Sequence, residues 1–127
     1  HGRYVVFESR ATNLVADDIN GEVDVFVRDR ETGQTKLVSV ASDGTQGDDT
    51  SHGSTISDNG RYVAFKSEAT NLVSDDTNTR TDVFVHDLDT GHTERVSLKS
   101  DGSQASGDWG TFFPSPAVSY DGRYVAF

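Results

Sequence analysis

An internal repeat constrains the fold of this chain more than any other feature of its sequence. The string Gly-Arg-Tyr-Val-x-Phe occurs at residues 2–7, 60–65 and 122–127. The three copies are spaced by 60 − 2 = 58 residues and then by 122 − 60 = 62 residues. A fixed period of this kind is typical of folds built from repeated supersecondary units.

The similarity extends well beyond that string. When residues 1–46 are compared with residues 59–104 without a gap, 28 of the 46 positions are identical. We therefore predict a single repeat region over residues 1–127. Its units are repeat one (1–58), repeat two (59–120) and the start of a third repeat (121–127).

Each repeat contains short apolar runs rich in Val, Phe and Tyr and bounded by turn residues, a pattern typical of β-strands. The runs at the first repeat lie at residues 4–7, 25–27, 37–40 and 54–57. Asx-Gly pairs at 59–60 and 121–122 predict tight turns, and Thr32-Gly33 predicts a hairpin. The sequence shows no sustained helical period, so we expect an all-β chain.

Apolar residues occupy adjacent positions in these runs, so we expect the sheets to be covered on both faces. Short antiparallel strands in sheets that lie between neighbouring sheets are typical of β-propeller blades. The sequence therefore predicts a β-propeller-type repeat fold. It would contain about two four-stranded antiparallel blades plus the start of a third.

Three segments of the second repeat resemble a known family. Residues 56–65, 82–87 and 90–97 are similar to the TolB-type, WD40-like (PD40) propeller repeat, and the first repeat carries the same pattern. The resemblance covers essentially the whole chain outside the loops. It implies a blade that begins with the strand before the Asx-Gly turn. It also implies a bacterial protein with a periplasmic or secreted location.

The charge balance excludes several partners. The chain carries 21 acidic and 11 basic residues, which gives a formal net charge of −10. Nucleic-acid binding and docking on anionic membranes both need clustered basic residues. No apolar run approaches the roughly 20 residues of a membrane-spanning helix. We therefore expect no nucleic-acid partner and no membrane insertion.

An acidic loop that recurs in both repeats is the candidate metal site. Its candidate ligands are Asp17, Asp18, Asn20 and Asp24 in the first repeat, and Asp75, Asp76, Asn78 and Asp82 in the second. Oxygen donors on a flexible loop suit Ca²⁺. The pattern lacks the full loop of an EF-hand, and Asp and Asn also cap turns by accepting backbone hydrogen bonds. We expect no obligatory cofactor and leave calcium open beside the turn-capping role.

The residues Trp109, Phe112 and Phe113 form an aromatic cluster that the first repeat lacks. Exposed aromatic rings anchor protein partners or stack on sugars. The alternative is that these rings fold back over the edge of a blade.

No motif of nucleophilic, metal-dependent or phosphate-binding catalysis occurs in the sequence. We therefore expect a non-enzymatic binding or scaffold module that contacts a protein through its rim loops. Two alternatives stay open. One is a carbohydrate-binding propeller in which several copies form a homo-oligomer that completes the ring. The other is an accessory propeller of a larger hydrolase or lyase.

Overall fold

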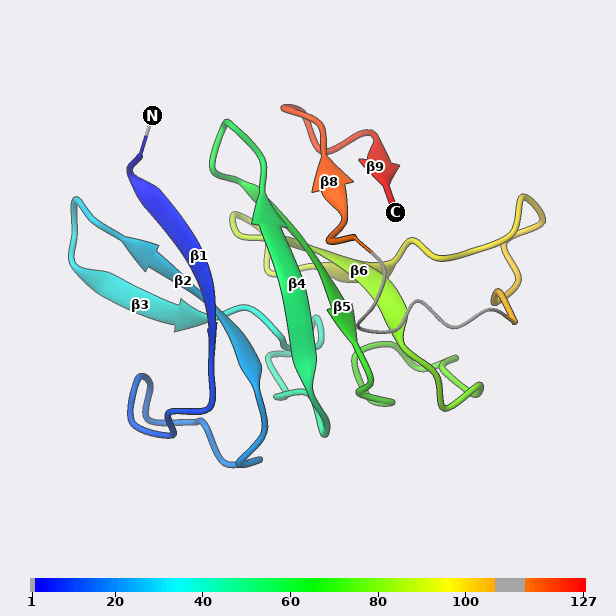
Figure 1. The fold of residues 1–127 in the computed structure, drawn as a ribbon, viewed down its shortest axis with the longest axis horizontal. Coiled ribbons are helices and arrows are strands. Elements are labelled where there is room, and N and C mark those ends of the chain that lie inside the picture. Colours follow the sequence, from blue (N-terminus) through cyan, green and yellow to red (C-terminus); the bar gives the residue numbers. More distant parts are fainter. Residues whose placement is uncertain (1, 107–113) are drawn as a thin grey trace.

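The structure is a computed structural model that describes residues 2–106 and 114–127, and within these ranges it contains β-strands and no helix. The strands form three antiparallel sheets that lie side by side (Figure 1). The first sheet contains β1 (Tyr4–Ser9), β2 (Asp24–Asp29) and β3 (Gln34–Leu37). The second contains β4 (Ser51–Ile56), β5 (Tyr62–Ser67), β6 (Asp82–Asp87) and β7 (Thr93–Arg95). The third contains β8 (Ala117–Val118) and β9 (Val125–Ala126).

This arrangement confirms the predicted fold class. The three sheets correspond to strands two to four of one blade, all four strands of the next, and the first two strands of a third. As the family resemblance implied, β4 belongs to the first repeat but pairs with β5 of the second. A strand is thus shared across the repeat boundary.

Two strand predictions were wrong in their boundaries. The strand expected at 54–57 begins earlier, at Ser51, and ends at Ile56. The apolar run at 37–40 was expected to be a strand, but β3 begins at Gln34 and ends at Leu37. Beyond Leu37 the hydroxyl of Ser39 turns inward and donates to the Asp24 carboxylate at 2.6 Å. The Val40 amide then bonds the Val38 carbonyl at 2.8 Å, which bends the chain away from β2.

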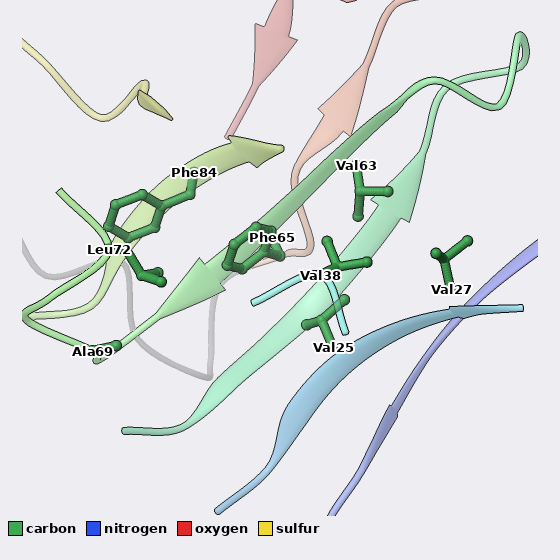
Figure 2. Packing of buried hydrophobic residues seen from close by; sticks show 8 residues of the cluster. All are labelled: Val25, Val27, Val38, Val63, Phe65, Ala69, Leu72 and Phe84. Atoms are coloured by element: carbon green, nitrogen blue, oxygen red, sulfur yellow. The ribbon is translucent and has the colours of Figure 1, made fainter. Parts of the chain in front are cut away.

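The core lies between the first and second sheets, as Figure 2 shows. Val25 and Val27 of β2 and Val38 face Val63 and Phe65 of β5. The rest of the cluster comes from β6 and the loop after β5, namely Phe84, Ala69 and Leu72. Because neighbours cover both faces, five successive residues of β5 are buried, and this explains why its sequence does not alternate.

A tyrosine of each blade packs on a glycine of the next. The Tyr4 ring lies against Gly60 in the β4–β5 turn, and the Tyr62 ring lies against Gly122 in the β8–β9 turn. Both glycines have positive φ, +75° and +74°. The repeated Gly-Arg-Tyr string therefore supplies both halves of the contact between blades.

The arginine of the same string ties neighbouring strands together. Arg3 donates two hydrogen bonds to Asp29 at 3.0 and 2.8 Å, and Arg61 does the same to Asp87 at 2.9 and 2.7 Å. Each guanidinium also lies about 5 Å above the ring of the tyrosine that follows it.

Candidate functional site

The two ends of the sheets carry different connections. Tight turns, among them those of β4–β5 and β8–β9, lie at the upper end in Figure 1, and the long loops after β1 and β5 lie at the lower end. The predicted metal ligands belong to the long loops.

In the first repeat, two of the predicted ligands are buried and share one amide. The Gln46 side-chain amide donates to Asp18 Oδ1 at 3.0 Å and to Asp24 Oδ2 at 2.9 Å. Asp18 is 6% exposed and Asp24 is fully buried. Burial raises the pKa of Asp24, while hydrogen bonds to its carboxylate, from Ser39 first, act in the opposite direction.

Asn20 has a structural role in the same loop. Its Nδ2 donates to the Gly47 carbonyl at 2.9 Å, and its Oδ1 accepts from the Glu22 amide at 2.8 Å. Asp17 is exposed. The turn-forming alternative therefore describes Asn20 in this structure.

The second repeat contains the same buried network. Gln104 donates to Asp76 Oδ1 at 2.9 Å and to Asp82 Oδ2 at 3.3 Å, and Asn78 donates to Asp82 Oδ2 at 3.2 Å. The hydroxyl of Ser97 donates to Asp82 Oδ1 at 2.5 Å. Burial is also the main cause that raises the pKa of Asp76.

The second network holds a buried guanidinium. The Arg95 side chain is 3% exposed, and its Nη1 lies 3.6 Å from Asp76 Oδ1 and 3.9 Å from Asp82 Oδ2. Its Nη2 lies 3.2 Å from Asp75 Oδ2 and donates to the Asp75 carbonyl at 3.3 Å. Three of the predicted ligands in this repeat therefore surround a cation that the chain itself provides.

Sequence reasoning missed Gln46, Gln104 and Arg95. The two glutamines were detectable, because they are identical residues at matched positions of the repeats. Within residues 2–106 and 114–127, no three His, Asp or Glu side chains are grouped in a way that could hold a metal ion. Calcium binding stays a prediction.

The aromatic residues Trp109, Phe112 and Phe113 lie outside the described residues. Their suggested role as a binding site therefore stays a prediction as well.

The tight-turn end has a small pocket between the first two sheets, which we call the inter-sheet pocket. Its volume is about 160 Å³. Tyr4, Val27 and Leu88 provide apolar walls. The polar lining residues are Asp29, Thr32, Gln34, Lys36 and Asp89, and Gly60 completes the lining.

A wider groove lies on the other side of Tyr4, and we call it the turn groove. Its volume is about 510 Å³, and it runs between Gly2–Tyr4 and the β4–β5 turn. Tyr120, which is 68% exposed, lines it from the third sheet. Tyr4 and Gly60 line both cavities, so the two meet at the contact between blades.

In the part of the chain that the structure covers, no helix is long and apolar enough to cross a membrane.

Comparison with known proteins shows a likeness in fold. No protein-family model matches the chain, and neither does any curated protein. Among solved structures, TolB from Acinetobacter baumannii is similar over 98% of this chain, with a TM-score of 0.55 and 18% sequence identity. The chain spans 23% of the length of that protein. The fold is thus TolB-like, whereas the assignment to PD40 repeats stays a prediction.

Proposed function

We propose that this chain is a non-enzymatic binding module of a TolB-like propeller that docks a protein partner. The observation that carries the proposal is the pair of cavities at the tight-turn end, where the inter-sheet pocket and the turn groove meet at Tyr4. Tyr4 and Gly60, which pack on each other between the two blades, line both cavities, so the surface is already formed before a partner binds.

The chemistry of the surface suits a peptide. The apolar walls of the inter-sheet pocket can hold one side chain of a partner, and the hydroxyl and amide groups around them can bind its backbone. Tyr120 stands exposed beside the turn groove, and exposed tyrosines are frequent energetic centres of protein interfaces.

The buried carboxylates of the long loops are already hydrogen-bonded within the chain, which leaves fewer groups for a partner there. The proposal therefore places the partner at the tight-turn end. Docking on the long rim loops stays the sequence-based prediction. A periplasmic or secreted location, which the resemblance implied, is part of the same proposal.

A selection from a random peptide library tests the proposal, with a glycan array probed in parallel. We expect peptides to be selected and glycans to be silent. Amide shifts in NMR spectra should then change at Tyr4, Gly60 and Leu88. Tyr120→Ser should weaken binding of the selected peptide at least tenfold.

The matched control is Tyr124→Ser, which removes a tyrosine of similar exposure, 64% against 68%, that does not line either cavity. It should leave the affinity within about twofold. If the protein binds glycans on the array and no peptide is selected from the library, the carbohydrate-binding alternative replaces this proposal. If a selected peptide changes the chemical shifts of amides in the long loops instead, the binding site lies at the opposite end of the sheets.

A further inference from the structure

The two repeats treat the same carboxylate pair differently. Asp18 and Asp24 in the first repeat align with Asp76 and Asp82 in the second, and each pair is bridged by a glutamine amide. Among the described residues, only the second pair has a guanidinium beside it, from Arg95. The aligned residue in the first repeat is Leu37.

The register of the sheets shows that the two positions are equivalent in space. Leu37 lies opposite Phe26 on the neighbouring strand, and Arg95 lies opposite Phe84 at the aligned position. Leu37 therefore occupies the same position in its sheet as Arg95 does in the next one. Its side chain is apolar, so it brings no charge to the aspartates.

The first repeat consequently buries two carboxylates with no cationic side chain beside them among residues 2–106 and 114–127. Asp18 Oδ2 is buried, and it has no hydrogen-bond partner among the described residues. Burial of an ionised carboxylate without compensation is costly, and proteins usually pair such a group or use it to bind a metal.

We propose that the first repeat binds a calcium ion beside the glutamine-bridged carboxylates of Asp18 and Asp24, at the position where the second repeat carries the Arg95 guanidinium. This site is independent of the proposed partner surface at the opposite end. Of the two loops predicted to bind calcium, the proposal keeps the first. In the second loop, Arg95 forms ion pairs with the carboxylates in place of a metal ion.

The ligands follow from the equivalence of the repeats. The carboxylates of Asp18 and Asp24 supply two ligands, because Asp18 Oδ1 and Asp24 Oδ2 correspond to the two oxygens nearest to Arg95 Nη1. The second oxygen of Asp18, Oδ2, accepts no hydrogen bond from the described residues. The Asp17 carbonyl is a third ligand, because the aligned Asp75 carbonyl accepts a hydrogen bond from Arg95. An all-oxygen set in an irregular loop, with water completing the shell, suits Ca²⁺ better than Mg²⁺, which requires strict octahedral geometry.

The test compares the intact protein with Leu37→Arg, which places in the first repeat the cation that the second already has. Calorimetric titration with CaCl₂ and thermal melts with Ca²⁺ or EDTA are the measurements. For the native sequence we expect heat of binding and a rise in Tm of about 10 °C at a free Ca²⁺ concentration of about one hundred times Kd. Leu37→Arg should show neither response, and its Tm in EDTA should exceed that of the native protein.

Gln34→Arg is the control for charge, because it adds the same cation to the same strand but near the tight-turn end. It should keep the response to Ca²⁺. Asp18→Asn should lose the response to Ca²⁺, and it tests the site independently if the Leu37→Arg variant does not fold. The proposal is overturned if the native protein shows no response to CaCl₂, or if Asp18→Asn or a folded Leu37→Arg variant keeps the native affinity.

Discussion

Replacement of Arg95 by leucine would give the second repeat the residue that the first repeat has at this position. The Arg95 side chain is 3% exposed and faces the carboxylates of Asp76 and Asp82, whose side chains are 2% and 0% exposed. The Arg95→Leu variant would keep most of the buried volume but would leave both carboxylates without their cation.

The expected loss in the free energy of unfolding follows from this burial. Removal of one partner from a buried ion pair costs about 3–5 kcal/mol, because the other charge stays buried without compensation. The value here should lie near 3 kcal/mol, since Nε and Nη1 of Arg95 are buried without hydrogen bonds among the described residues and already carry a desolvation cost. For a chain of this size, 3 kcal/mol corresponds to a fall in Tm of about 12 °C.

Urea denaturation at pH 7 and pH 5 measures the effect. Burial raises the pKa of Asp76 and Arg95 opposes that rise, so loss of Arg95 should raise this pKa further. A carboxyl group with a raised pKa binds a proton more readily in the folded state, so the variant should recover stability as the pH falls. The difference from the native protein should therefore be smaller at pH 5.

Arg10→Leu is the matched control, because Arg10 forms an ion pair with Glu22 while its side chain is 70% exposed. It should change the free energy of unfolding by less than about 1 kcal/mol. If Arg95→Leu is no less stable than Arg10→Leu, the reasoning about the buried network is wrong.

Two further variants test the contacts made by the repeated string. Gly60→Ala should destabilise the protein by about 2–4 kcal/mol in urea denaturation, because its Cβ would overlap the Tyr4 ring and its φ is +75°. Gly44→Ala, at φ +88° with open space around it, should cost only about 1 kcal/mol, and equal losses would contradict the packing argument. The hydrogen bonds from Arg61 lower the pKa of Asp87, so the stability that they provide is present above pH 3.8 and is lost as the pH falls below it. Asp87→Asn should be less stable than the native protein at pH 7 and should show a shallower loss of stability below pH 3.8, and an unchanged acid limb would count against this role.

The strands and turns were largely predictable because local physical rules determine them. Runs of Val, Phe and Tyr between Asx-Gly and Thr-Gly pairs gave most of the strand positions, and the repeat gave the same answer twice. The boundary of β3 was not predictable, because the bend after Leu37 depends on a hydrogen bond between Ser39 and Asp24. That contact joins residues 15 positions apart in the sequence.

The acidic loops were recognised as special, but their chemistry was only partly inferred. The sequence suggested that Asp18 and Asp24 act together, and the structure places them on one glutamine amide. The sequence could not indicate that Gln46, 22 positions beyond Asp24, is the residue whose side-chain amide joins the two carboxylates. Nor could it indicate that Arg95 reaches back to its aspartates from a different strand.

The repeat, the strand pattern and the net charge are properties of the sequence itself, because each depends on residue types and on spacings along the chain. The repeat and the strand pattern determined an all-β chain of antiparallel blades, and the net charge excluded nucleic-acid and anionic-membrane partners. Tertiary structure alone decided which carboxylates are buried, which of them have a cation, and where two blades leave a cavity. These properties depend on residues that are distant in the sequence and adjacent in space, and desolvation and charge pairing act only across that adjacency.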